Sequence, residues 1–208
     1  TRRLMVPGLL SVLVVSIAAY EIYFKKLKNV CDRIEDAEDE EFHRLDYEEE
    51  RYGAILQCIN VVAQVLCIAL LGSGYSMRYI HDGRTSLVKF LTACVLFLIC
   101  FFYCGMAQAR YVKLLQKVHP EKKGDIASKD FHKQWLESCD EAEKEAVYQS
   151  SYSTYIFSGK LIGILLVMTM FAHLFFNTGV FAIVVVGVIY LCITVKYCVS
   201  CVKLKNKS

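Results

Sequence analysis

The chain has 208 residues, of which 55% are hydrophobic and 22% are charged, and its formal net charge is +3. This composition excludes an ordinary soluble globular protein, because the apolar residues form runs long enough to cross a bilayer, roughly 20 residues each. The ten cysteines lie mostly in these runs, and none lies in a predicted outer loop. We therefore expect small apolar packing residues in place of a disulfide framework.

Five apolar runs predict five membrane-spanning helices. The runs cover residues 4–24, 54–71, 87–105, 156–176 and 180–199. The expected fold is all-α, a multi-pass membrane helical bundle with helical extensions into the cytoplasm, in a single membrane domain over 1–208.

An acidic linker follows the first run, over residues 25–52. A thin apolar stripe lies beneath its charges, which favours a helix that extends the first span, bends near Asp39 and leads into the second span. The acidic surface is then either a solvated helix face or a contact surface for a basic partner.

The second run carries three amide side chains, Gln57, Asn60 and Gln64, at steps of three and four residues. This spacing places them on one face of a helix. Amides that face lipid would stay unsatisfied at a cost of several kcal/mol each, so we expect all three to face protein or water. The stripe predicts either hydrogen bonds between helices or a polar path for a substrate.

A long polar segment, residues 109–155, separates the third and fourth runs. Pro120 and Gly124 predict a turn, and from Ser128 onward neither Pro nor Gly interrupts the sequence before Gly159. We therefore expect one unbroken helix from about Ser128 into the fourth span. Its apolar stripe packs either on the helix built on Ile34, Phe42 and Leu45 or on a partner. The candidate partner contacts are Trp135, Glu137, Asp140, Glu141 and Glu145.

The fourth run holds a GxxxG pair, Gly159 and Gly163, and a deeply placed His173. The glycines predict a close approach of a second helix. An ionisable side chain within a span marks a functional site or a hydrogen bond that supports packing. A CxxC at Cys198 and Cys201 has no second pair or nearby His, so we expect no metal there.

The distribution of Lys and Arg predicts the orientation. Segments 25–52, 109–160 and 196–208 hold most of these residues, which places them in the cytoplasm and the loop 72–86 outside. Thr1 then lies outside. A further span upstream of Thr1 would return the natural N-terminus to the cytoplasm.

Several motifs carry a resemblance to a known family. HPEKKG, then DFHKQWLESCDEAEK, a Tyr-rich stretch and a final helical hairpin resemble an uncharacterised family of multi-span membrane proteins of Gram-positive bacteria, known as domain of unknown function 3169. The likeness is strongest over 119–197. It implies a location in the bacterial cell membrane and supplies no activity and no functional residues.

Three classes of function are compatible with these patterns. The favoured one is a non-catalytic accessory or regulatory subunit whose cytoplasmic helices bind a transporter subunit or a cytosolic regulator, or a second copy of the chain. The alternative is a small transporter or channel with a polar path lined by the second and fourth spans. An enzyme is not expected. The residues His119, His132 and Cys139 could ligate a metal, but His132 and Cys139 are seven residues apart, roughly two helical turns, which is too far for joint ligation without a bend. No catalytic or phosphate-binding motif occurs. We expect no cofactor, and no nucleic acid as a direct partner.

Overall fold

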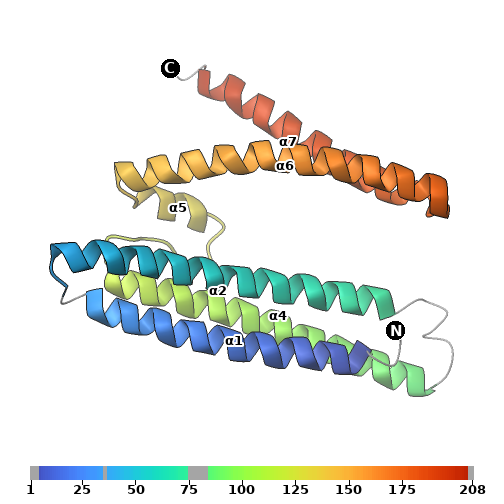
Figure 1. The fold of residues 1–208 in the computed structure, drawn as a ribbon, viewed down its shortest axis with the longest axis horizontal. Coiled ribbons are helices and arrows are strands. Elements are labelled where there is room, and N and C mark those ends of the chain that lie inside the picture. The colour runs from blue at the N-terminus through green and yellow to red at the C-terminus, as the bar shows by residue number, and fades with distance from the viewer. Residues whose placement is uncertain (1–4, 35–36, 75–83, 206–208) are drawn as a thin grey trace. The chain divides into compact units, whose positions relative to one another are not determined.

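The computed structural model describes residues 5–34, 37–74 and 84–205, and these ranges are almost entirely helical (Figure 1). The helices are α1 (Met5–Ile34), α2 (Asp39–Gly74), α4 (Arg84–Val118), α5 (Phe131–Glu137), α6 (Glu141–Phe176) and α7 (Phe181–Lys205). No strand occurs in these ranges, which confirms the all-α fold. The outer loop predicted over 72–86 lies mostly outside the described residues.

Five of the helices, α1, α2, α4, α6 and α7, are long and apolar enough to cross a membrane. This confirms the number of predicted spans. Helix α2 is longer than the apolar run within it. It has 36 residues, or about 54 Å at 1.5 Å per residue, whereas the hydrocarbon core of a bilayer is about 30 Å thick. The bend expected near Asp39 is also present, since α2 begins at that residue.

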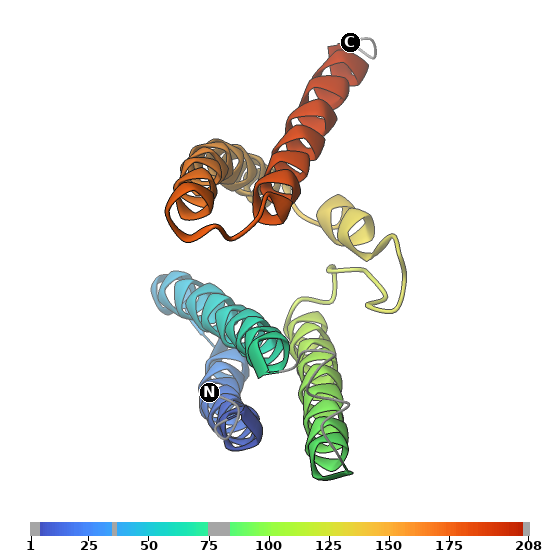
Figure 2. The ribbon, with the colours of Figure 1, turned by 90° about the vertical axis from the view of Figure 1, so that its right-hand side faces the viewer.

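The chain divides into two compact units, residues 1–138 and 139–208, and each is described by itself. In the first, α2 runs antiparallel to α1 and α4, and each of these three helices contacts the other two (Figure 2). We call α1, α2 and α4 the three-helix unit; α5 follows them in the same compact unit. Its core has many small side chains, which let helices approach closely. The fully buried positions include Leu9, Ala63, Cys67, Ala93, Cys100 and Ala107.

The cysteines behave partly as predicted. Cys31, Cys67, Cys100, Cys104 and Cys139 are buried, and all ten thiols are free. The prediction of apolar packing is wrong for four others, which are exposed: Cys58, Cys192, Cys198 and Cys201.

The second unit is a hairpin of α6 and α7. Asn177 adopts a left-handed conformation (φ 49°) at the end of α6, and Gly179 follows with φ 81°. These two residues reverse the chain, because Asn and Gly tolerate positive φ better than other residues. At the far end of the hairpin the rings of Tyr155 and Tyr197 stack with centroids 4.1 Å apart.

The unbroken helix expected from Ser128 is wrong. Helix α5 begins at Phe131 and ends at Glu137, and α6 begins at Glu141. Asp140 causes the restart, because its carboxylate accepts the backbone N–H of Glu143 at 2.7 Å while the Glu143 side chain accepts the N–H of Asp140 at 2.9 Å. This capping box stabilises a new helix start without any Pro or Gly.

Replacement of the cap tests this explanation. Asp140→Ala should lower the free energy of unfolding by about 1 kcal/mol, the usual cost of losing an N-cap side chain, and should speed amide hydrogen exchange in the first turn of α6. Glu143→Gln is the control, because Gln also serves in a capping box. Unchanged exchange in Asp140→Ala would show that the break has another cause.

Candidate functional site: the charged end of the three-helix unit

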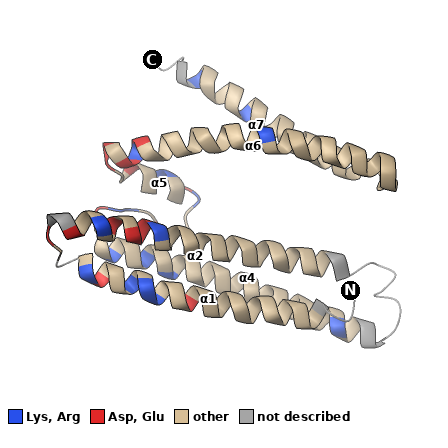
Figure 3. Ribbon diagram, viewed as in Figure 1, with Lys and Arg blue, Asp and Glu red and all other residues tan. Residues whose placement is uncertain are grey.

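Most of the charged residues of the three-helix unit gather at one end (Figure 3). We call this the charged end and define it as residues 25–34, 39–53 and 106–123. It consists of the end of α1, the start of α2 and the end of α4 with the turn after it. These helices continue past the apolar runs as one packed bundle, whose core here includes Leu27, Val30, Cys31 and Leu45.

A buried carboxylate lies within this bundle. The side chain of Glu49, on α2, is 9% exposed, and that of His119, directly after α4, is 22% exposed. His119 Nε2 lies 3.1 Å and 3.3 Å from the two carboxylate oxygens of Glu49. The thiol of Cys31 on α1 donates to the same carboxylate, with Sγ 3.9 Å from Oε2. Helix α1, helix α2 and the turn after α4 thus each supply one member of this cluster.

The electrostatics of the cluster favour a protonated imidazole. The hydrogen bond with Glu49 raises the pKa of His119 above its ordinary value; burial opposes this, and the negative charges of Glu49, Glu121 and Asp46 add to it. His119 Nδ1 also lies 3.4 Å from the exposed carboxylate of Glu121. When His119 is protonated, the pair is an ion pair, and its Glu49 side is closed off from bulk water.

The sequence held a signal for this pair. Glu49 follows Leu45 by four residues and precedes Leu56 by seven, so it occupies the apolar stripe of α2, where Leu45 and Leu56 are both fully buried. An acid at such a position needs a buried partner. The predicted acidic linker includes Glu49 only as one charge of a run, so the pair with His119 was not predicted.

A second polar contact joins α1 to α4. The guanidinium of Arg110 binds the carboxylate of Glu21 through two N–O contacts of 2.6 Å and 3.1 Å, and the hydroxyl of Tyr103 donates to Glu21 at 3.0 Å. Arg110 also lies over the ring of Phe24, 4.5 Å from its centroid. One turn away, the hydroxyl of Tyr20 donates to the carbonyl of Ala107 at 2.7 Å. Glu21 was not among the predicted site residues.

A double-mutant cycle tests the coupling of this pair. Glu21→Gln and Arg110→Gln should each lower the free energy of unfolding, and the double variant should lower it by about 1 kcal/mol less than the two single losses added together. The side chains of Glu21 and Arg110 are 44% and 42% exposed. We therefore expect a coupling free energy at the low end of the range for bidentate pairs. Additive losses in an SDS titration would show that the contact contributes nothing.

The predicted amide stripe is only partly inside the unit. Asn60 is buried, and Gln64 is half-buried and hydrogen-bonds with Cys104. Gln57 does not face the interior of the unit, because its side chain is exposed. Leu56 and Asn60 lie at the centre of the buried face of α2. Gln57 directly follows Leu56, so its side chain points about 100° around the helix axis from that residue and away from the buried face.

The other predicted intramembrane residues lie in the α6–α7 hairpin. His173 is half-buried, and among the described residues its Nδ1 has no hydrogen-bond partner. A Cβ added at Gly159 or Gly163 would meet no atom within 4 Å. Within the hairpin, no second helix therefore approaches this GxxxG closely.

The predicted partner contacts differ in their surroundings. Trp135 is half-buried on α5, with its ring 5.7 Å from that of Phe131. Asp140 is a structural cap, as described above. The other three are exposed acids, each bonded to a neighbour on its own helix: Glu137 to Lys133, Glu141 to Lys144, and Glu145 to Gln149.

The helix built on Ile34, Phe42 and Leu45 was one of the two covers expected for the apolar stripe of Phe131 and Trp135, and its buried cluster includes neither residue. Ile34 and Leu45 pack with Val30 in a small cluster of their own, and Phe42 is 38% exposed. Among the described residues, no group of three or more His, Cys, Asp or Glu side chains could hold a metal ion, so His119, His132 and Cys139 do not form one.

Comparison with known proteins places the chain in a family. Residues 6–200 match the family described as protein of unknown function (DUF3169). The chain belongs to this family. The match covers both units of this DUF3169 chain, the first three spans included. No curated protein and no solved structure matches the chain.

Proposed function

We propose that this DUF3169 chain is an accessory or regulatory membrane subunit, not an enzyme, which binds a protein partner through its charged end and its exposed acids on α5 and α6. The observation that carries the proposal is that the polar segments between the spans are folded. The charged end has its own buried residues, Val30, Ile34 and Leu45, while its outer surface carries ion pairs such as Arg33–Glu41.

The turn after α4 supports the same proposal. Gln116 on α4 donates to the carbonyl of Gly124 at 2.9 Å, and the N–H of Lys123 donates to the hydroxyl of Ser138 at 3.1 Å. The segment between α4 and α5 is therefore held at both sides by side chains. A surface fixed in this way loses less conformational entropy on binding than a flexible linker would.

Orientation is part of the proposal. The excess of Lys and Arg in 25–52 and 109–160 favours a cytoplasmic position for these segments in a bacterial cell membrane. The partner would then be a cytosolic regulator or a cytoplasmic domain of a transporter. Its contact surface would carry basic side chains opposite Glu137, Glu141 and Glu145.

Charge reversal tests the proposed contact. The triple variant Glu137→Lys, Glu141→Lys and Glu145→Lys should lose a stoichiometric partner that co-purifies with the wild-type chain from its native membrane, because like charges would then face each other. Asp140 is left unchanged because it caps α6. The control is Lys133→Gln with Lys144→Gln, which breaks the same ion pairs and keeps the acidic surface. A partner that stays bound to the triple variant would contradict the proposal.

A second candidate function, a small transporter or channel, rests on Asn60 and Gln64. These amides face the interior of the three-helix unit at the level of an apolar run. If they line a polar path for a substrate, Asn60→Leu should abolish the flux of that substrate into liposomes that contain the chain, while the fold is retained. If they only pack, the variant changes stability alone.

A further inference from the structure

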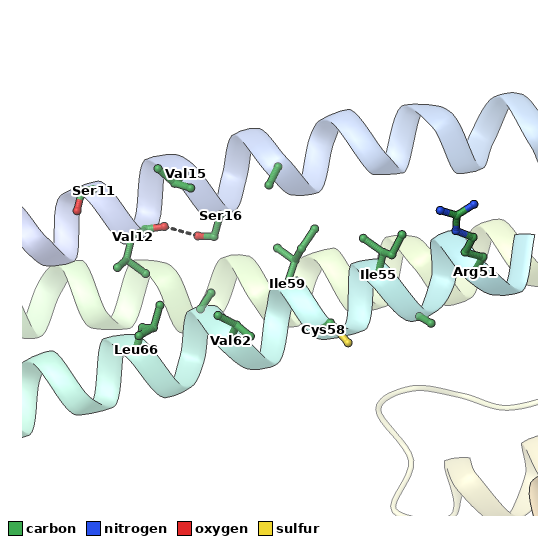
Figure 4. Close-up of a pocket in the computed structure, with 13 residues that line it drawn as sticks. Ser11, Val12, Val15, Ser16, Arg51, Ile55, Cys58, Ile59, Val62 and Leu66 are labelled. Carbon is green, nitrogen blue, oxygen red and sulfur yellow. Dashed lines mark hydrogen bonds between the residues drawn. The ribbon is translucent and has the colours of Figure 1, made fainter. Parts of the chain in front are cut away.

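A long apolar groove runs along the surface of the three-helix unit between α1 and α2 (Figure 4). Its volume is about 660 Å³, and it extends on α2 from Arg51 to Leu66. Fifteen residue steps along a helix correspond to roughly 22 Å, which exceeds the ~15 Å depth of one leaflet of the hydrocarbon core. Most of it is lined by aliphatic side chains, among them Val15, Ile59 and Val62.

The groove offers almost no free polar group along this length. The hydroxyl of Ser16 donates to the carbonyl of Val12 at 2.6 Å, and that of Ser11 donates to the carbonyl of Gly8 at 2.8 Å. Both serines are therefore satisfied by their own helix. An occupant gains from this surface by burying apolar area.

Cations lie at one end of the groove. Arg51 is exposed there, and no ion pair ties its guanidinium to another described residue. Tyr52 directly follows Arg51 on α2, and its ring centroid lies 6.2 Å from that of Tyr23 on α1. Lys26 Nζ lies 5.0 Å from the ring centroid of Tyr23. Lys26 also lies two turns beyond Ala19, which lines the groove, and so shares its face of α1.

We propose that this groove binds one anionic phospholipid, with an acyl chain between α1 and α2 and the phosphate between Arg51 and Lys26. Cations and tyrosines at the end of an apolar groove match the charge and polarity of a phospholipid along its length. An acyl chain would bury apolar area along this aliphatic lining, and the phosphate would meet the cations at its end.

Photocrosslinking in liposomes tests the proposal on the full chain. The liposomes consist of phosphatidylcholine with a small fraction of phosphatidylglycerol that carries a diazirine on one acyl chain; a parallel sample carries the diazirine on phosphatidylcholine. Mass spectrometry should find adducts within residues 11–19 and 54–66, several-fold more abundant with phosphatidylglycerol. Free inorganic phosphate in excess should not reduce them, because it has no acyl chain.

Two variants separate the headgroup from the acyl chain. Arg51→Gln with Lys26→Gln should reduce the phosphatidylglycerol adducts about fivefold per cation removed, the factor that corresponds to ~1 kcal/mol per basic side chain at an anionic surface. The control Lys28→Gln with Lys113→Gln removes two exposed cations from other faces and should change nothing. Val62→Trp should fill the groove and reduce the adducts of both lipids, whereas Ile68→Trp, an exposed position outside the groove, should not.

Several results would overturn the proposal. Equal labelling by the two lipids in the wild-type chain would exclude headgroup recognition. Adducts absent from 11–19 and 54–66 would show that protein covers the groove, whether another part of this chain or a second copy. If Lys28→Gln with Lys113→Gln lost as many phosphatidylglycerol adducts as Arg51→Gln with Lys26→Gln, the general positive charge of the surface would explain the labelling. Retained helical content and unchanged unfolding in SDS would establish that each variant is folded.

Discussion

His119→Leu should lower the free energy of unfolding by about 3–5 kcal/mol, because it leaves the carboxylate of Glu49 buried without its imidazole partner. The carboxylate is 9% exposed, and among the described residues the Cys31 thiol is its remaining hydrogen-bond donor. Unfolding in an SDS titration of mixed micelles would measure the loss. Glu121→Gln is the matched control: it removes the exposed carboxylate near His119 Nδ1 and should cost less than about 1 kcal/mol.

The double variant Glu49→Leu with His119→Leu separates charge burial from packing. Replacing both members of a buried pair by apolar side chains of similar size is often neutral or stabilising, so the double variant should recover most of the loss. If it is instead as unstable as His119→Leu, the pair acts through its shape or through hydrogen bonds to groups other than each other.

The same pair should make stability depend on pH with a defined sign. The folded state raises the pKa of His119, so between the ordinary value of about 6.5 and the folded value the folded chain binds more protons than the unfolded chain. The contribution is complete below pH ~6.5 and is lost as the pH rises through the folded pKa. Stability of the wild-type chain should therefore fall over that range, and His119→Leu should lack this component. An identical slope in both would contradict the assignment.

The spans were predictable because hydropathy and length decide them, whereas the contacts between spans were not. Glu21 and Arg110 are 89 positions apart, and neither residue alone predicts the other. The break before α6 is a different case. Asp140 and Glu143 form a capping box that is visible in the sequence, but the absence of Pro and Gly was given more weight than this local signal.

The spacing of glycines did not predict where two helices of the described chain approach closely. The GxxxG motif favoured Gly159 and Gly163 as packing positions, and both have open space around them. The close approach occurs at Gly53 on α2, which no motif marks. A Cβ added there would clash with the hydroxyl of Tyr111 on α4 and lie 3.1 Å from its Cζ and 3.2 Å from its Cε2. Which glycine lets two helices meet thus depends on the tertiary arrangement and not on spacing.

Gly53→Ala should accordingly destabilise the chain by about 1–3 kcal/mol, the usual cost of overpacking, even though Ala is the better helix former. Gly105→Ala on α4 should have the opposite sign and stabilise by about 0.5–1 kcal/mol, because nothing lies within 4 Å of its added Cβ and only the gain in helix propensity remains. The two substitutions are chemically identical, so their difference in an SDS titration reports the environment alone.

Tyr111→Phe identifies the clashing group. In the Gly53→Ala background it removes the hydroxyl, which is the nearest atom, and should restore part of the lost stability; the ring carbons remain close, so recovery is incomplete. In the wild-type background the same change relieves nothing and should be neutral or slightly destabilising. If Gly53→Ala were as harmless as Gly105→Ala, Tyr111 would have to leave its position at little cost, and the packing of α2 on α4 at the charged end would be looser than the structure shows.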